Sequence, residues 1–249
     1  MGSLVSYDMA DGVATLVMDD GKVNVLSLSM LVAINEALDS AEADGRAVVL
    51  SGRPGVFSAG FDLGTLRGGG PDAAAMGRAG FALASRLLSF PYPVVAACTG
   101  HAIAMGAFLL CSADYRVGAT GTYKLTANEV AIGFPLPAVA VAILRNRLTP
   151  SALNRAATLA EVFTPENAVE NGFLDRVVAP DSVLAEAQEL ARTLTSLDQA
   201  AHAATKLTVR RSTLDILAAD LAADRPIIDG VGGPTTDAGD VGASVASHG

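Results

Sequence analysis

A chain of 249 residues can bury one sizeable hydrophobic core, and 51% hydrophobic against 17% charged residues exclude disorder for most of it. The formal net charge of −9 gives no general attraction to nucleic acid or to anionic lipid, so we expect neither as a partner. The low share of charged residues suggests that other subunits cover part of the apolar surface.

Strands and helices alternate in the first half of the chain. The run Val13–Met18 predicts a strand, and apolar residues at helical spacing predict a helix over 28–43 with Ser27 or Ser29 as its N-cap. Short continuous apolar runs are typical of strands that are buried on both faces. The same criteria predict a strand over 47–50, a loop over 51–70, a helix over 73–89, a strand over 94–98, a helix over 105–113 and a strand near 115–118.

The second half of the chain is mainly helical. Helices are expected over about 137–147, 150–160, 165–171, 182–197 and 199–221. After about 229 the sequence is small and polar and is expected to lie loosely on the surface. This order indicates an α/β core over residues 1–198 and a helical C-terminal region with a tail over 199–249 that could make subunit contacts.

Three features bear on the compartment. Cys98 and Cys111 lie among apolar or small residues without a Cys-x-x-Cys spacing, so we expect two buried, reduced thiols. The first residues lack the basic start and the long apolar stretch of a secretory signal. No uninterrupted apolar run reaches the roughly 18 residues of a membrane span. A cytoplasmic location without membrane attachment is therefore expected.

Two glycine-containing segments each join a strand to a helix. The first is Val56–Leu63 and the second is Thr99–Ala107. Small residues at such corners let the backbone approach a ligand, and the first N–H groups of a helix have no partner. Two corners that face one another would place two N–H donors on one oxygen, which is an oxyanion hole. Tight strand-to-helix turns without a ligand are the alternative.

These two segments together resemble the crotonase (enoyl-CoA hydratase/isomerase) family. The segments 22–26, 113–117 and 168–177 match its pattern in the same order and spacing, so the resemblance covers about residues 10–180. It implies an α/β fold of the crotonase-like (ClpP/crotonase) type, a spiral of ββα units with a helical C-terminal region. It also implies a homotrimer or a dimer of trimers. The family's usual basic C-terminal end is not found beyond residue 200.

The resemblance implies an acyl-CoA thioester as substrate, with coenzyme A as part of that substrate and no separate cofactor. In the family the thioester oxygen accepts hydrogen bonds from two backbone N–H groups, which by position are those of Phe61 and Met105 here. Met105 stands where the family commonly has Gly, so it keeps the N–H and adds a side chain at the pocket wall. The remaining positions implied to border the substrate are Lys22, Val23, Ser58, Ala59, Gly60, Asp62, Gly106 and Phe108.

Two carboxylates near these segments have competing interpretations. Asp62 could act as an acid, but a cap on the helix that follows it is favoured. Glu129 lies between a strand and a small apolar stretch, where desolvation would raise its pKa toward useful base strength. By itself Glu129 could be a surface or capping residue. The resemblance places it at one of the family's two catalytic glutamate positions.

The position of the family's other catalytic glutamate, six residues before Asp114, holds Phe108. Adding water across a C2=C3 bond must activate water and deliver a proton to C2, which two carboxylates serve naturally. Moving a double bond from C3=C4 to C2=C3 needs one base. The Asn128–Glu129 pair and Phe108 look more like the family's monofunctional enoyl-CoA isomerases of fatty-acid metabolism (β-oxidation) than its hydratases. A hydratase and a non-catalytic acyl-CoA-binding protein are the alternatives.

Other kinds of site find little support. His101, His202 and His248 are dispersed without ligand spacing, so no metal site is expected, and His101 is favoured as a structural residue beside the second corner. Gly68–Gly70 is not a phosphate-binding loop of the Walker type, and predicts a flexible loop over the acyl pocket or a linker. Ser58 lies in no Gly-x-Ser-x-Gly elbow, which disfavours serine hydrolase chemistry.

Overall fold

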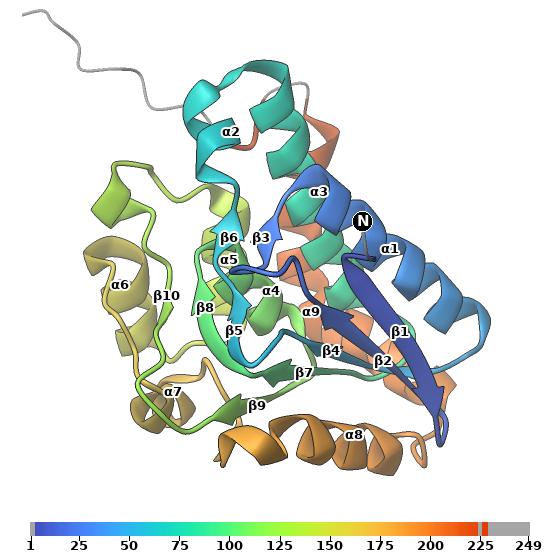
Figure 1. Ribbon diagram of the computed structural model, residues 1–249. Helices are drawn as coiled ribbons and strands as arrows, with labels where there is room; N and C mark the ends of the chain where they lie inside the picture. Colours follow the sequence, from blue (N-terminus) through green and yellow to red (C-terminus); the bar gives the residue numbers. More distant parts are fainter. Residues whose placement is uncertain (1–2, 224–225, 229–249) are drawn as a thin grey trace, which may run out of the picture.

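The computed structural model describes residues 3–223 and 226–228. Its main sheet has the strand order β1-β2-β4-β7-β9-β11 (Figure 1). The first pair is antiparallel and every later pair is parallel. The strands are β1 (Val5–Ala10), β2 (Val13–Met18), β4 (Ala47–Ser51), β7 (Val94–Cys98), β9 (Tyr115–Ala119) and β11 (Arg176–Val178).

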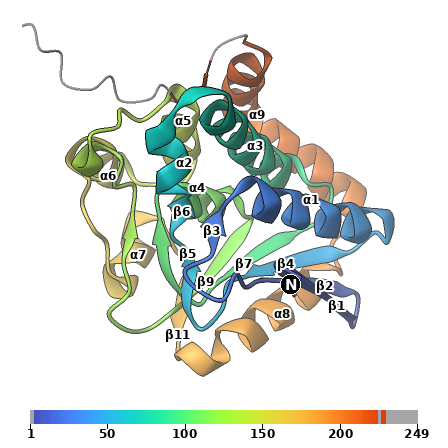
Figure 2. The ribbon, with the colours of Figure 1, turned by 45° about the horizontal axis from the view of Figure 1, so that its top comes forward.

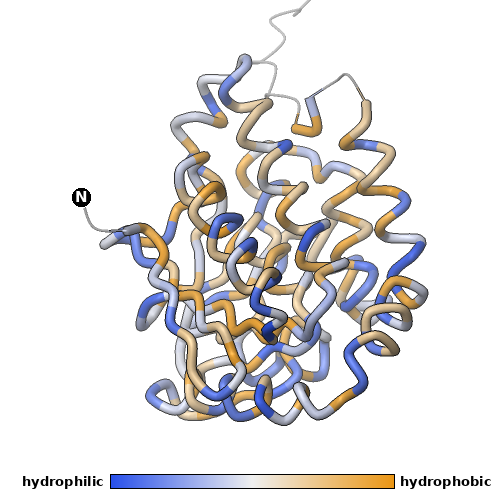
Figure 3. Tube along the Cα trace, turned by 90° about the vertical axis from the view of Figure 1, so that its right-hand side faces the viewer, coloured by the Kyte–Doolittle hydropathy of each residue, from blue (hydrophilic) through white to orange (hydrophobic). Residues whose placement is uncertain are grey.

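Helices cover both faces of this sheet. On one face lie α1 (Leu28–Ala43), α3 (Gly70–Ser89) and α4 (Met105–Ser112), whereas α8 (Val183–Leu194) covers the other (Figures 1 and 2). Alternate residues of one strand therefore enter different cores: Val48 belongs to the larger cluster and Val49 to the cluster beneath α8. This burial on both sides explains the continuous apolar runs of the central strands, and Figure 3 shows hydrophobic residues gathered there.

A second set of short strands lies beside the main sheet (Figure 1). β10 (Leu125–Thr126), β8 (Gly100–Ile103) and β5 (Gly55–Ser58) form a parallel sheet, and β3 (Val25–Leu26) pairs with β6 (Gly60–Phe61). The repeated order is a strand of the main sheet, a strand of this layer and a helix, as in β7, β8 and α4. The expected spiral of ββα units is confirmed.

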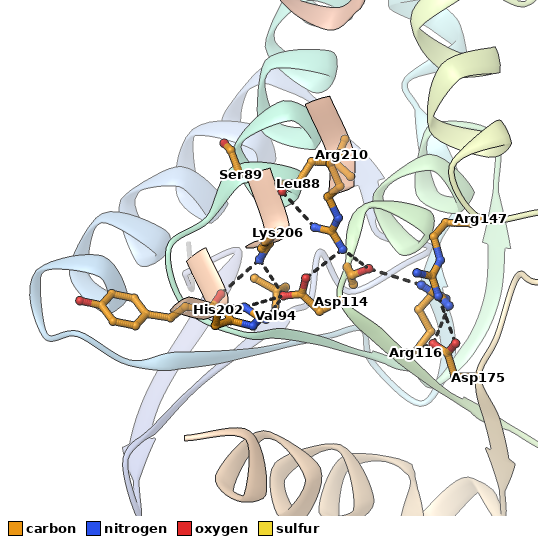
Figure 4. A network of polar contacts seen from close by, with 12 residues as sticks. Leu88, Ser89, Val94, Asp114, Arg116, Arg147, Asp175, His202, Lys206 and Arg210 are labelled. Atoms are coloured by element: carbon orange, nitrogen blue, oxygen red, sulfur yellow. Dashed lines mark hydrogen bonds and ion pairs between the residues drawn. The ribbon is translucent and has the colours of Figure 1, made fainter. Parts of the chain in front are cut away.

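The last long helix, α9 (Gln199–Ala222), packs along α3 (Figure 2). Its buried cations meet Asp114, whose carboxylate lies 2.6 Å from Lys206 Nζ and 2.8 Å from Arg210 Nη2 (Figure 4). Burial lowers the pKa of Lys206 to about 8 even though Asp114 opposes the shift. Because the buried charges compensate one another only in this arrangement, the cluster fixes where α9 lies against the core.

The remaining helices match the expected ranges within a few residues. They are α5 (Ala138–Arg145), α6 (Pro150–Leu159) and α7 (Pro165–Asn171), with 3-10 turns at Val130–Ile132 and Pro180–Ser182. Ser27 is the N-cap of α1, since its side chain accepts from Met30 N. Cys98 and Cys111 are free and buried, as expected, and burial raises their pKa values to about 12 and about 11. None of the described helices is long and apolar enough to cross a bilayer.

The structure differs from the expectations in three places. The loop over 51–70 contains β5, β6 and α2 (Leu63–Gly68), because strands of two to four residues carry no periodicity that a sequence could reveal. Gly69, at φ +64°, joins α2 directly to α3, so of the two interpretations of Gly68–Gly70 the structure shows the linker and not the flexible loop. β1 was not predicted because five of its six residues are exposed at the sheet edge. The tail expected after about 229 lies outside the described residues.

Candidate active site

The first glycine corner runs from β5 through β6 into α2. Gly60 has φ +85°, a backbone conformation that favours glycine. The hydroxyl of Ser58 donates to Asn24 O at 2.7 Å and accepts from Gly60 N at 3.1 Å. The Asn24 side chain in turn donates to Phe57 O at 3.1 Å. Buried side-chain hydrogen bonds therefore hold this corner against the β2–β3 connection.

The second corner lies between β8 and α4. Ala104, a non-glycine residue with φ 51°, precedes Met105, the first residue of α4. Side chains rarely tolerate this conformation, and such residues gather at functional sites. Ala104 N donates to Thr126 O at 2.9 Å, which holds the strained residue in place. The Met105 N–H is thereby placed at a helix start, where it has no intrahelical partner.

The two corners are in direct backbone contact. A Cβ on Gly60 would lie 2.8 Å from Ile103 O and 3.1 Å from Met105 N. On the other side of the contact, a Cβ on Gly106 would lie 2.5 Å from Ser58 O. Real Cβ atoms do not approach so closely, so both positions require glycine. Because Phe61 N is bonded to the carbonyl carbon of Gly60, the N–H groups of Phe61 and Met105 lie on adjoining stretches of backbone.

The Phe61 ring sits in a notch of α3. A Cβ on Gly80 would lie 2.4 Å from ring atoms of Phe61, and Phe81 meets the same ring edge-on at 6.3 Å between centroids. The ring anchors the first corner from the helix side, while Ser58 anchors it from the sheet side. The Phe61 side chain is thus packed against α3, while its backbone N directly follows Gly60, which contacts the second corner.

A cavity of about 150 Å³ opens beside the two corners. Its described lining is apolar except for the neighbouring residues Asn128 and Glu129, which follow β10. The apolar lining comes from Ala59, Phe61, Leu63, Leu66, Phe81, Ile103, Ala104, Phe108, Ile132, Phe134, Pro135, Pro137 and Ile228. Among the described residues that line it, Glu129 is the one ionisable group.

Glu129 is held by its own backbone. Its carbonyl accepts from Ile132 N at 3.0 Å and from Phe134 N at 2.9 Å, which fixes the turn after β10. Burial raises the pKa of Glu129 to about 7, as its apolar surroundings led us to expect. Glu129 Oε2 and Asn128 Oδ1 are buried without a hydrogen-bond partner in the described part of the chain. A carboxyl in this state can accept or release a proton near neutral pH.

Of the other residues singled out in the sequence, some lie at or behind the cavity and others lie beside the first corner. Phe108 lines the cavity, whereas the Met105 side chain is fully buried behind it and lies close to Gly80 of α3. Met105 is thus not among the described residues that line the cavity. Lys22 and Val23 lie beside the first corner: Ala59 N donates to Val23 O at 3.0 Å, and Lys22 is exposed.

Asp62 and His101 have structural partners. Asp62 is the N-cap of α2, with its carboxylate accepting from Thr65 N at 2.6 Å, and this hydrogen bond lowers its pKa. The prediction of a cap is confirmed. His101 Nδ1 accepts from Lys124 N at 3.0 Å, and the ring meets Tyr123 edge-on. No group of three or more possible metal ligands occurs among the described residues.

Sequence reasoning missed several lining residues. Leu66 comes from α2, Phe81 from α3, Ile132 from the turn after Glu129 and Ile228 from the segment beyond α9. Phe81 shares the apolar face of α3 with ordinary core residues, so its helical spacing gives no sign of the cavity. Ile228 follows the last predicted helix and lies beyond residues 10–180, on which the resemblance was based.

The fold and this pair of corners define a crotonase-like protein. The chain matches the family model "Enoyl-CoA hydratase/isomerase" over residues 8–231, and it belongs to that family. It is 32% identical to the human mitochondrial enoyl-CoA delta isomerase 1 over 226 residues, which are 89% of this chain and 75% of the human protein.

Solved structures agree on the fold and carry both activity names. The enoyl-CoA hydratase EchA3 from Mycobacterium ulcerans superposes with a TM-score of 0.85 at 50% identity, covering 88% of this chain and 96% of that chain. A structure described as the Mtb enoyl-CoA isomerase has a TM-score of 0.86 at 48% identity and covers 90% of this chain and 100% of that chain. Membership of the family therefore leaves isomerase and hydratase to be distinguished by the site.

Gly80→Ala tests the notch that holds Phe61. The new methyl group would collide with the ring, so we expect a loss of about 1–3 kcal/mol in the free energy of unfolding. Gly68→Ala is the matched control, because this helical glycine has open space around its Cβ position. Urea denaturation measures both variants. Equal stability of the two variants would contradict the packing described for Phe61.

Glu129→Gln tests the raised pKa through stability. A carboxyl with a pKa above its ordinary value favours the folded state while protonated, and this contribution is lost as the pH rises through about 7. Glutamine does not titrate, so the variant should gain about 2–3 kcal/mol relative to the parent between pH 5 and pH 8. Glu36→Gln, at an exposed position of α1, should show no such gain. If the difference in the free energy of unfolding between variant and parent is the same at pH 5 and at pH 8, the raised pKa of Glu129 is contradicted.

Proposed function

We propose that the protein is a Δ3–Δ2 enoyl-CoA isomerase. The observation that carries this proposal is the lone carboxyl of the described cavity, Glu129, opposite the phenyl ring of Phe108 at the position where hydratases of the family have a second glutamate. The isomerase names of the human relative and of the Mtb structure support it. The alternative, hydration of a trans-2-enoyl-CoA, is supported by the name of the EchA3 structure.

In the proposed reaction Glu129 acts twice. As a carboxylate it takes a proton from C2 of a 3-enoyl-CoA, and the electrons of the broken C–H bond move into the thioester as a dienolate. The N–H groups of Phe61 and Met105 donate to the enolate oxygen, a type of contact whose loss typically costs about 10²–10³ in rate. The protonated Glu129 then returns the proton to C4, and the double bond ends between C2 and C3. No atom is gained or lost.

The pKa of Glu129 suits both halves of this cycle. A value of about 7 leaves a substantial fraction ionised at neutral pH, while the carboxylic acid that forms remains a good donor to C4. The apolar lining keeps bulk water from the intermediate, which favours return of the proton to C4 over its exchange with solvent.

The coenzyme A part is proposed to lie along the first corner. Lys22 and Val23 extend this edge from the β2–β3 connection, next to Ser58, Ala59, Gly60 and Asp62. The exposed ammonium of Lys22 provides a local positive charge for ligand phosphates in a chain whose net charge is −9.

Turnover of two substrates tests the proposal. Purified protein should convert trans-3-hexenoyl-CoA to the 2-enoyl isomer and should add water to crotonyl-CoA far more slowly. Glu129→Gln should lower isomerisation by about 10²–10⁴ because it removes the base, while binding of hexanoyl-CoA stays within a few-fold. Hydration at a rate comparable with isomerisation would contradict the assignment. Tight binding with no turnover by the parent protein would instead identify a non-catalytic acyl-CoA-binding protein.

A trimer or a dimer of trimers is also proposed. Large apolar side chains are exposed on and around α6 and on α9 of the single chain, including Leu159 at 67%, Val162 at 48% and Val209 at 71%. Such exposure is typical of surfaces that meet other subunits. Sedimentation velocity should give a species of three or six chains, and a stable monomer at micromolar concentration would contradict this assembly.

A further inference from the structure

Three aromatic rings close one side of the cavity. Phe81 of α3 stacks on Phe108 of α4 with 6.2 Å between centroids and 23° between planes, and Phe61 meets Phe81 edge-on. Phe81 and Phe108 are 1% and 2% exposed, so the rings are packed from behind as well. A ring of this wall cannot move without giving up its contacts with the next, which makes the wall stiff.

Ile228 completes the enclosure from outside the ββα core. It lines the cavity together with Leu66 of α2 and packs on α3, where a Cβ on Gly77 would lie 3.2 Å from Ile228 Cδ1. Gly77 stands one helical turn before Phe81, so Ile228 extends the aromatic wall along the same face of α3. The adjacent Ile227 is 6% exposed and belongs to the main core, which fastens the segment 226–228.

The end of α9 is tied to α3 in the same place. Arg78, next to Gly77, donates to Leu221 O and, at 3.0 Å, to Ala223 O. Within the first half of the helix, Lys206 and Arg210 contact Asp114. The helix α9 is therefore held in its first half and at its C-terminal end, and the position of Ile228 over the cavity follows from packing on α3.

The volume of the cavity limits the length of the acyl chain that it can hold. An apolar cavity of about 150 Å³ is large enough to bind benzene, a ligand with six carbon atoms. With the carbonyl carbon at the two N–H groups, five further carbons fill the space. We propose that the site takes acyl chains of about six carbons and that Ile228 is the residue that excludes longer ones. This proposal rests on the proposed function of the cavity as the acyl site.

The proposed limit on acyl-chain length is tested by the isomerisation of 3-enoyl-CoA substrates whose acyl chains have six, eight, ten and twelve carbons. The parent protein should show its highest kcat/KM at six carbons, with a fall of at least about tenfold by ten carbons, since one misplaced methylene in an apolar pocket costs roughly 10-fold or more. Ile228→Ala should raise the ratio of the ten-carbon to the six-carbon kcat/KM by about tenfold. Ile228→Val should move it in the same direction by less.

Ile216→Ala is the matched control. Ile216 lies on α9, is 36% exposed and is not among the residues that line the acyl cavity, so its truncation should leave the chain-length ratio unchanged. Phe108→Ala opens the stacked wall from the opposite side and should also favour longer chains. A flat profile from six to twelve carbons in the parent, or an unchanged ratio in a folded Ile228→Ala variant, would overturn the proposal.

Measurements of ligand binding distinguish a failure of the chain-length proposal from a failure of the proposed isomerase function. Calorimetric titration with saturated hexanoyl-CoA and decanoyl-CoA measures the length limit without any reaction. If no 3-enoyl-CoA is turned over but the parent prefers hexanoyl-CoA and Ile228→Ala removes the preference, the isomerase assignment fails and the wall is supported. If turnover occurs while parent and Ile228→Ala bind both thioesters with the same relative affinity, the role of Ile228 is contradicted and the isomerase assignment stands.

Discussion

The backbone contact between the two glycine corners is the constraint on which the rest of the site depends. Gly60 and Gly106 let two strand-to-helix connections touch where any side chain would collide with a carbonyl oxygen. Ala104 accepts a positive φ so that α4 begins beside that contact. Donors held in this way need no reorganisation when charge develops on a bound oxygen, and such preorganisation usually contributes most to enzymatic stabilisation of an oxyanion.

A second constraint is the dryness of the cavity. Apolar side chains surround Glu129, and the resulting desolvation raises its pKa to about 7. Phe108 contributes to this lining at the position where the resemblance implies a carboxylate in hydratases of the family. Under the proposed function, the same apolar lining would keep water from the intermediate and favour a proton shuttle over addition of water.

The sequence predicted the long elements and marked the two glycine corners, and it failed where the signal depends on contacts between distant segments. Apolar runs such as Val94–Cys98 revealed buried strands, and the spacing of glycines marked both corners. The contact of Gly60 with Ile103 and Met105 depends on two segments far apart in the chain, so it needed coordinates. The inward direction of Phe81 and the reach of Ile228 back to α3 likewise follow from tertiary packing and leave no local pattern.

The central claim is that Glu129 carries a proton from C2 to C4 of the substrate, and the most direct test follows the hydrogen that leaves C2. A 3-enoyl-CoA carrying deuterium at C2, converted in ordinary water, should give a 2-enoyl product with deuterium at C4 when one enclosed carboxyl carries the atom between the two carbons. Mass spectrometry and NMR of the product locate the label. Deuterium at C4 that disappears in Glu129→Gln is the predicted result. A product without deuterium at C4, or one with a hydroxyl group at C3, would contradict the account.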